Sequence, residues 1–362
     1  MRRGISAVMA ATAGVSLALL PVPAAGATSI PIECGTHVPD LGHLTHNLVC
    51  PTVAITIGPA ATIDLRGYTL RGPGRGTASQ AIVLHSEDGG SGSGDLTLLN
   101  GTIDDWGRVV NGDVYSVTTN RMTLTDIGTV FDSFGVNLTS SDSRFERNGA
   151  VVSSPAGGRV DVRRSTFVDN IGVFYEGPYS PNVYIEASTF RRNDSVLDIS
   201  EGQVTIVNST FRDGVTAISS FWGGTRISGS TFRGYETAVV TNWLPGARPA
   251  VHHDQFTGNT FHDNGVALQL GVNANVAASD FTRNRTGVLS QTYGAPNPVS
   301  DVTLTTNTFT RNGDGVIIDT VVHLQGNRAT RNTGYGFNVP MAVDLGGNVA
   351  TRNGINCVGL VC

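Results

Sequence analysis

Ser165-Thr166-Phe167-Val168-Asp169-Asn170 and Ser188-Thr189-Phe190-Arg191-Arg192-Asn193 are two copies of one short pattern, and this pattern decides the fold of the chain. Related units recur along the sequence, anchored on Phe145, Phe167, Phe190, Phe211, Phe232, Phe261, Phe281, Phe309, Ala329 and Ala350. The steps between anchors are 22, 23, 21, 21, 29, 20, 28, 20 and 21 residues. Self-similarity at this period indicates a solenoid, in which each repeat packs against its neighbours.

Three further columns keep register with the anchor. Every repeat has Ser or Asn two residues before it, and eight of the ten have Asn three residues after it. Five residues before it, from the second repeat on, lie Val162, Ile185, Ile206, Ile227, Phe256, Val276, Leu304, Leu324 and Leu345. Apolar and polar residues alternate around this column, which is the period of a strand with one buried face.

Short strands, turn residues that tolerate left-handed backbone and about 21 residues per unit favour a parallel β-helix over a leucine-rich horseshoe. We therefore predict an all-β fold, a right-handed single-stranded parallel β-helix (solenoid) of about a dozen coils with disulfide-closed ends. The Asn column predicts a buried amide ladder, in which each side chain bonds its equivalent in the next coil.

The composition agrees with a solenoid and excludes several chemistries. The chain has 362 residues, 45 of them Gly, and only 15% are charged. All 24 basic residues are Arg, so mechanisms that need a lysine base or Schiff base are excluded. The net charge is -5, which argues against a nucleic-acid partner because such proteins usually carry a basic patch or stripe.

The first 27 residues have the features of a signal peptide. Arg2 and Arg3 precede an apolar run that ends at Leu20, and small residues around Ala27 form a cleavage site. We expect a secreted, extracellular protein, cleaved near Ala27, whose mature chain has no membrane span.

Four cysteines remain in the mature chain, and the even number in an exported protein predicts disulfides. About a dozen coils at ~4.8 Å place the ends of the helix more than ~50 Å apart, so the bonds must join Cys34 to Cys50 and Cys357 to Cys362. The predicted layout is a signal peptide (1–27), an N-terminal cap with a disulfide (28–51), the parallel β-helix (52–356) and a C-terminal disulfide loop (357–362).

The segment from Leu65 to Gly72, with the sequence Leu-Arg-Gly-Tyr-Thr-Leu-Arg-Gly, and the serial Ser-Thr-Phe-x-x-Asn units resemble the right-handed parallel β-helix repeat proteins of the pectin-lyase-like superfamily. The resemblance covers nearly the whole mature chain and implies the fold. It does not imply one activity, because the superfamily holds polysaccharide lyases, hydrolases, epimerases, adhesins and proteins with no established chemistry. The paired aspartates with Gly-His-Gly and Arg-Ile-Lys of polygalacturonase-like enzymes are missing. Tyr335-Gly336-Phe337 resembles an epimerase motif but lacks the Asp-Pro-His that should follow.

Two long steps and an aromatic stretch locate loops on one side of the stack. The two long steps between anchors contain the loops Asn242 to Asp254 and Gln291 to Asp301, and the aromatic stretch contains Tyr175. Counting from the second strand of each repeat predicts an aromatic platform for sugar rings, with Trp222, Trp243, a gap at Gly271, and Tyr293 in successive coils. Two residues nearer the strand, the same count predicts a polar row for hydroxyl recognition: Ser220, Thr241, Gln269, Gln291 and Asp319. The alternative is that these aromatic rings fold back to cover the edge of the core.

Catalytic candidates are few. His252, His253 and Asp254 lie in the longest insertion and could supply an imidazole base. Asp104 and Asp105 are a pair of carboxylates, but neighbours on a strand face opposite ways. We assign no metal site and no cofactor, although an arginine-base, calcium-assisted lyase mechanism stays open, with Asp198, Glu201, Arg226 or Arg248 as conceivable parts.

The sequence favours a secreted protein that binds an extracellular or cell-wall polysaccharide along an exterior groove. The alternatives are a polysaccharide lyase, hydrolase or epimerase, and a non-catalytic adhesin or structural solenoid. The sequence leaves open whether the protein is an enzyme, which polysaccharide it binds, and its oligomeric state.

Overall fold

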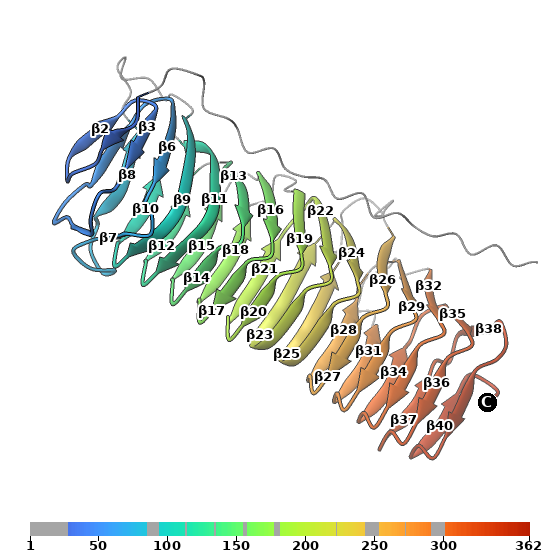
Figure 1. Ribbon diagram of the computed structural model, residues 1–362. Helices are drawn as coiled ribbons and strands as arrows, with labels where there is room; N and C mark the ends of the chain where they lie inside the picture. The colour runs from blue at the N-terminus through green and yellow to red at the C-terminus, as the bar shows by residue number, and fades with distance from the viewer. Residues whose placement is uncertain are drawn as a thin grey trace, which may run out of the picture.

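The computed structural model describes residues 28–84, 94–112, 114–133, 135–154, 158–176, 182–221, 223–242, 253–271, 273–290 and 301–362. These residues form forty β-strands and no helix, so a helical membrane span is not found among them. The strands pair in parallel and wind into an elongated solenoid of about 13 turns, with the first and last strands at opposite ends (Figure 1). The predicted all-β parallel solenoid is therefore confirmed. The predicted signal peptide, 1–27, lies outside the described residues.

Each turn of the solenoid adds one strand to each of three stacks, which we call stacks A, B and C. Stack A comprises β1 (Ile30–Pro31), β3 (Leu41–His43), β6 (Ala60–Asp64), the first parts of β9 (Gly94–Asp104) and β11 (Val114–Thr125), β13 (Asn137–Ser141), β16 (Arg159–Arg163), β19 (Asn182–Glu186), β22 (Gln203–Val207), β24 (Gly224–Ser228), β26 (Asp254–Thr257), β29 (Ala274–Ala277), β32 (Val302–Thr305), β35 (Val322–Gln325) and β38 (Ala342–Asp344).

Stack B contains the strands that carry the Phe anchors. It comprises β4 (Leu48–Val49), β7 (Thr69–Arg71), the ends of β9 and β11, β14 (Arg144–Glu146), β17 (Thr166–Val168), β20 (Thr189–Arg191), the first parts of β23 (Thr210–Phe221) and β25 (Thr231–Asn242), β27 (Thr260–His262), β30 (Asp280–Thr282), β33 (Thr308–Thr310), β36 (Arg328–Thr330) and β39 (Val349–Thr351).

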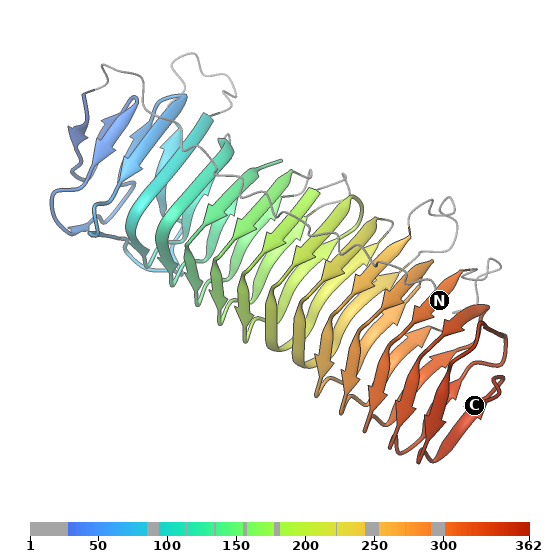
Figure 2. The same ribbon diagram turned by 45° about the vertical axis from the view of Figure 1, so that its right-hand side comes forward.

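Stack C closes each coil before the chain returns to stack A (Figure 2). It comprises β2 (Thr36–Val38), β5 (Ile55–Ile57), β8 (Gln80–Leu84), β10 (Arg108–Asn111), β12 (Thr129–Asp132), β15 (Ala150–Ser154), β18 (Gly172–Glu176), β21 (Ser195–Ile199), the ends of β23 and β25, β28 (Val266–Leu270), β31 (Thr286–Ser290), β34 (Asp314–Ile318), β37 (Tyr335–Asn338) and β40 (Ile355–Val358).

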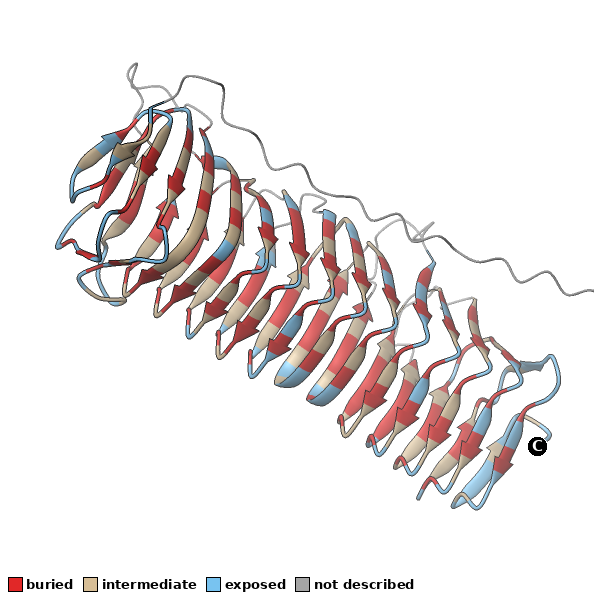
Figure 3. Cartoon of the chain, viewed as in Figure 1, coloured by how far each residue is buried: buried red, intermediate tan, exposed pale blue. Residues whose placement is uncertain are grey.

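Aromatic stacking fills the interior behind stack B. The rings of Phe145, Phe167, Phe190, Phe211, Phe232, Phe261, Phe281 and Phe309 lie face to face, with centroids 4.6–5.0 Å apart and interplanar angles of 14° or less. All are fully buried, and Figure 3 shows buried residues alternating along the strands from coil to coil. Burial of one large ring per coil gives each repeat a core that it could not form alone.

The turn between stacks A and B explains the Ser and Asn column. A residue with positive φ, such as Arg164 (φ 47°), precedes a buried Ser or Asn, and that side chain accepts a hydrogen bond from the equivalent backbone N–H of the preceding coil. Ser143 N donates to Ser165 Oγ at 3.2 Å, and Asn307 N donates to Asn327 Oδ1 at 3.0 Å. Backbone donors that would otherwise be buried without a partner are thereby satisfied.

The turn between stacks B and C carries the predicted Asn ladder, and the structure confirms it. Asn312 is representative: its Oδ1 accepts from Asn284 N at 2.8 Å and from Asn284 Nδ2 at 3.1 Å, and its own Nδ2 donates to the Phe281 carbonyl at 3.0 Å. The ladder is interrupted at Gly214 and Tyr235, where a Cβ at Gly214 would lie 2.6 Å from the Tyr235 ring. The buried tyrosine therefore takes the space of the missing amides.

Both ends of the chain differ from the regular coils. The disulfides join Cys34 to Cys50 and Cys357 to Cys362, as predicted. Strands β1 to β4, within the predicted cap, already pair in register with the next coil. At the other end the assignment of Leu345 to the buried column is wrong. Leu324 pairs with Asp344, and Leu345 is 52% exposed because the turn that follows is one residue longer.

Replacement of Asn312 with Ala tests the ladder. It leaves the Asn284 N–H and the Phe281 carbonyl buried without partners, and each such group costs about 1–3 kcal/mol. We expect a loss of about 2–4 kcal/mol in the free energy of unfolding, measured by urea denaturation, together with faster hydrogen exchange at the Asn284 amide. Asn111→Ala, at an exposed position of β10, is the matched control and should leave both unchanged. Equal effects of the two variants would contradict the ladder's role.

Candidate functional site

The corner between stack C and stack A is where the coils differ in length. The chain from β18 to β19, from β25 to β26 and from β31 to β32 crosses this corner, and these are the aromatic stretch and the two long steps of the sequence. The prediction that all three excursions emerge on one side of the stack is confirmed. Six predicted residues lie outside the described residues: Trp222, between β23 and β24, and Trp243, Arg248, His252, Gln291 and Tyr293 on the two long steps.

The polar row predicted along this corner does not form one exposed surface. Ser220 and Thr241 are buried and face the interior, whereas Gln269 is half-buried on the outer face of stack C and Asp319 is exposed. The cause is a difference of one residue in register. The count began at Ala238 in one coil and at Val288 in another, but Val239 is the residue equivalent to Val288, because Val239 pairs with Leu268 and Leu268 with Val288.

Tyr175 is the one predicted aromatic side chain within the described residues. It lies on the outer face of β18, beside Asp198 of β21, and is 59% exposed. Its ring is therefore available to a ligand rather than packed over the edge of the core. The burial of the Asp198 carboxyl raises its pKa, with a hydrogen bond from Ser219 acting in the opposite direction.

A row of polar side chains runs along the outer face of stack A, next to the same corner. Successive coils place its members directly side by side: Tyr184, Thr205, Arg226, Gln255 and Asn275. We call these five residues the stack A row. The alternation that buries Val183 and Ile185 turns Tyr184 outward, so the strand pattern of the sequence contained this signal.

A pocket of about 240 Å³ lies over the middle of the stack A row. It is lined by Gln203, Val204, Thr205, Gly224, Arg226, His253 and Gln255. His253 is the last residue before β26, at the end of the longest insertion, and both it and Arg226 are exposed. The lining therefore combines amide, hydroxyl, imidazole and guanidinium groups on a rigid strand surface.

The upstream end of the stack A row is held by charged neighbours. The Arg163 guanidinium lies 4.8 Å from the centroid of the Tyr184 ring and forms ion pairs with Asp161 (2.8 Å) and Glu186 (3.2 Å). These contacts fix the orientation of the tyrosine ring, and burial raises the pKa of its hydroxyl.

Asp254 does not face the pocket. Its side chain is fully buried behind the row, and its Oδ1 accepts a hydrogen bond from Thr225 N at 2.8 Å. Thr241 lies close enough to lower the pKa of the carboxyl slightly, yet its hydroxyl and Asp254 Oδ2 form no hydrogen bond of good geometry. Desolvation dominates and raises the pKa of Asp254 to about 7. The sequence-based grouping of Asp254 with His253 as catalytic candidates therefore needs correction, because adjacent strand residues face opposite ways.

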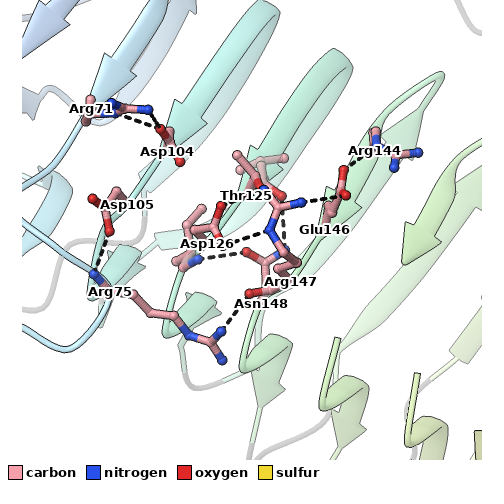
Figure 4. Close-up of polar contacts among 12 residues, drawn as sticks. Arg71, Arg75, Asp104, Asp105, Thr125, Asp126, Arg144, Glu146, Arg147 and Asn148 are labelled. Carbon is pink, nitrogen blue, oxygen red and sulfur yellow. Dashed lines mark hydrogen bonds and ion pairs between the residues drawn. The ribbon is translucent and has the colours of Figure 1, made fainter. Parts of the chain in front are cut away.

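The other carboxylate pair, Asp104 and Asp105, belongs to a network of charges near the N-terminal end of stack B (Figure 4). Asp104 forms an ion pair with Arg71, and Asp105 Oδ1 accepts from the Arg75 backbone N–H at 3.0 Å. In the next coils Arg147 donates to Asp126 at 2.7 Å, which lowers the pKa of that carboxyl. Both carboxylates of the pair are thus engaged by the arginine-rich segment at 71–75, which favours a structural role.

Histidines near the N-terminus are also engaged. The Ser29 hydroxyl hydrogen-bonds His43 Nδ1 at 2.6 Å, and His46 lies 3.8 Å from Glu33. Across the ranges that the structure describes, no three His, Cys, Asp or Glu side chains are grouped to hold a metal ion.

Comparison with known proteins agrees with the fold. Residues 198–353 match the family described as "Right handed beta helix region". Among solved structures the chain is similar to the A-module of the mannuronan C-5 epimerase AlgE6 of Azotobacter vinelandii, with 14% sequence identity over 91% of each chain and a TM-score of 0.20. That score carries no argument about activity. No curated protein matches the chain.

The buried Asp254 predicts an unusual dependence of stability on pH. The folded chain keeps this carboxyl protonated up to about pH 7, whereas the unfolded chain releases the proton near its ordinary pKa of about 3.9. The contribution to stability is therefore full below pH ~4 and is lost as the pH rises to about 7, by an amount on the order of 4 kcal/mol. Asp254→Asn should abolish this loss, so that urea midpoints at pH 5 and pH 8 differ less in the variant than in the wild type. Parallel pH profiles for the two proteins would contradict the assignment.

Proposed function

We propose that this right-handed β-helix repeat protein is exported, with residues 1–27 as its leader, and binds a polysaccharide along the outer face of stack A. The observation that carries the proposal is the pocket over the stack A row, which lies beside the corner that the connections after β18, β25 and β31 cross. Its paired disulfides are compatible with an oxidising, extracellular environment.

The chemistry of the stack A row suits a sugar chain. Tyr184 offers an aromatic face on which the apolar face of a sugar ring can pack. Gln203, Thr205 and Gln255 offer donors and acceptors to hydroxyl groups, and Arg226 offers a planar fork to a carboxylate. Neighbouring strands of a sheet are about 4.8 Å apart, so a linear polymer that follows the solenoid axis meets the same kind of contact in each coil.

Replacement of Gln255 with Ala tests the binding surface. The loss of one amide should weaken polysaccharide binding about three- to tenfold, measured by retention on immobilised glycans or by calorimetry. Gln325→Ala removes an exposed amide from β35 of the same stack, outside the pocket, and should leave binding unchanged. Binding that is insensitive to Gln255 and to Tyr184→Ala would refute the stack A surface.

A second candidate function, cleavage or epimerisation of a uronic-acid polymer, rests on the meeting of Arg226 and His253 in the pocket. In a lyase reaction the His253 imidazole would remove the proton from the carbon next to the sugar carboxylate, while Arg226 would stabilise the negative charge. The glycosidic oxygen would then leave and take up a proton, and a carbon–carbon double bond would remain in the sugar.

The two functions give different results with one pair of variants. The secreted protein is incubated with uronic-acid and neutral polysaccharides, with and without calcium, and unsaturated products and reducing ends are followed. If the protein is a lyase, His253→Ala should abolish product formation at least about a hundredfold while binding persists. If it only binds, neither the wild type nor His253→Ala yields products, and Gln255→Ala still weakens retention.

A further inference from the structure

The turn between stacks B and C places a charged side chain at the same exposed position in most coils. In the first part of the solenoid this residue is alternately Asp and Arg, and neighbouring coils form ion pairs. Arg147 meets Asp126 at 2.7 Å, Arg192 meets Asp169 at 2.6 Å, and Arg283 meets Asp263 at 2.7 Å in the same way. Arginine at this position therefore has a structural explanation wherever an acid occupies the preceding coil.

The last coils lack that explanation. The motif Thr-Arg-Asn occurs in four consecutive coils, and the strands that precede it pair Thr282 with Thr310, Thr310 with Thr330 and Thr330 with Thr351. The arginines of the last three copies, Arg311, Arg331 and Arg352, are exposed and form no ion pair or side-chain hydrogen bond with a residue that the structure describes. Like charges in neighbouring strands destabilise a sheet, so their repetition needs another cause.

A second column of cations, one residue before the turn position, lies in the middle of the solenoid. Arg191, Arg212 and Arg233 are exposed at the ends of their stack B strands and pair directly with one another in register. Of these three, Arg233 forms an ion pair with a described acid, Asp263, at 3.5 Å. This column continues through His262 to Thr282, whereas Arg283, Arg311, Arg331 and Arg352 follow the paired threonines by one residue and form the column of the turn. We call Arg283, Arg311, Arg331 and Arg352 the arginine stripe; the label β36 in Figure 1 marks the strand that precedes Arg331.

The acidic residues of the C-terminal coils lie elsewhere. From residue 281 onward the chain has six arginines and four aspartates. Asp301 lies 3.4 Å from His323 on stack A, and Asp344 is bonded within its own turn. Asp314, the nearest to the stripe in sequence, accepts a hydrogen bond from Tyr335 N at 2.8 Å. The C-terminal end is therefore basic along one edge although the whole chain is acidic.

We propose that the arginine stripe binds a linear polysaccharide that bears carboxylate groups, laid parallel to the solenoid axis. A guanidinium binds a carboxylate with two parallel hydrogen bonds. Because the chain has no lysine, all of its permanently cationic side chains are guanidinium groups. Because the side chains recur at the strand spacing of about 4.8 Å, an extended polymer can place anionic groups against several coils at once. The stripe lies at the turn between stacks B and C and is independent of the stack A surface proposed above.

The test compares two arginine pairs in the full-length secreted protein. Arg331→Gln with Arg352→Gln removes two members of the stripe, and Arg66→Gln with Arg121→Gln removes the same charge from exposed positions at the turn between stacks A and B. Affinity is measured at low and high salt for polygalacturonate, for neutral dextran and for double-stranded DNA.

We expect the stripe variant to bind polygalacturonate about fivefold more weakly than the wild type, and the control pair to change affinity by less than about twofold. Added polygalacturonate should raise the melting temperature of the wild type more than that of the stripe variant, and unchanged melting without polymer shows that the variant folds. Equal losses of polygalacturonate affinity for both arginine pairs would mean that only net charge matters and would overturn the proposal. Tighter binding of DNA than of polygalacturonate would also overturn it. If the stack A surface does not bind polysaccharide, the two arginine variants should still differ in their affinity for polygalacturonate.

Discussion

The rest of the structure depends on hydrogen bonds between adjacent coils, in which a turn side chain of one coil accepts from a backbone N–H of the coil before it. Two of the three corners are tight and bury their backbone N–H groups, which have no water to bond. Ser165 at the first corner and Asn170 at the second each accept one such bond, at 3.2 and 3.0 Å. These bonds set the position of one coil on the next, and the stacked phenylalanines follow from that registration rather than causing it.

The third corner is under no comparable constraint, and this decides where function can be placed. Insertions at either ladder would break a run of buried hydrogen bonds, whereas the connection from stack C to stack A can lengthen without touching the core. The described strands show this directly, since β25 ends at Asn242 and β26 begins at Asp254 while the neighbouring coils stay in register. The variable loops and the regular outer face of stack A consequently meet along one line.

The sequence was sufficient for the fold and insufficient for the site, and the reason is local. The Ser, Asn and Phe columns could be predicted because each has one fixed offset from its anchor. Stack C begins at a bend where two successive residues, such as Val196 and Leu197, are both buried, so alternation counted across the bend is ambiguous by one residue. As a result, the predicted polar row combined Ser220 and Thr241, which face the interior, with Gln269, which faces outward. Tyr184 was within reach of simple alternation, but its proximity to Arg226 depends on the pairing of three coils.

Charge on a solenoid obeys a one-dimensional rule. Each surface residue has only two equivalent neighbours, one in the coil before and one in the coil after. If the sign of the charge alternates from coil to coil, every charge has a partner of opposite sign. If several successive coils carry the same sign, the charges inside that run have no such partner. Asp169 and Arg192 illustrate the first arrangement, in which the arginine holds the pKa of the carboxyl below its ordinary value. Arg331 illustrates the second, because its neighbours in the column are Arg311 and Arg352. A globular protein could relieve such a run with an acid from a distant segment, but no described acid forms an ion pair with Arg311, Arg331 or Arg352. Anions from solution can compensate these charges, and the proposed polysaccharide would supply them at the coil spacing.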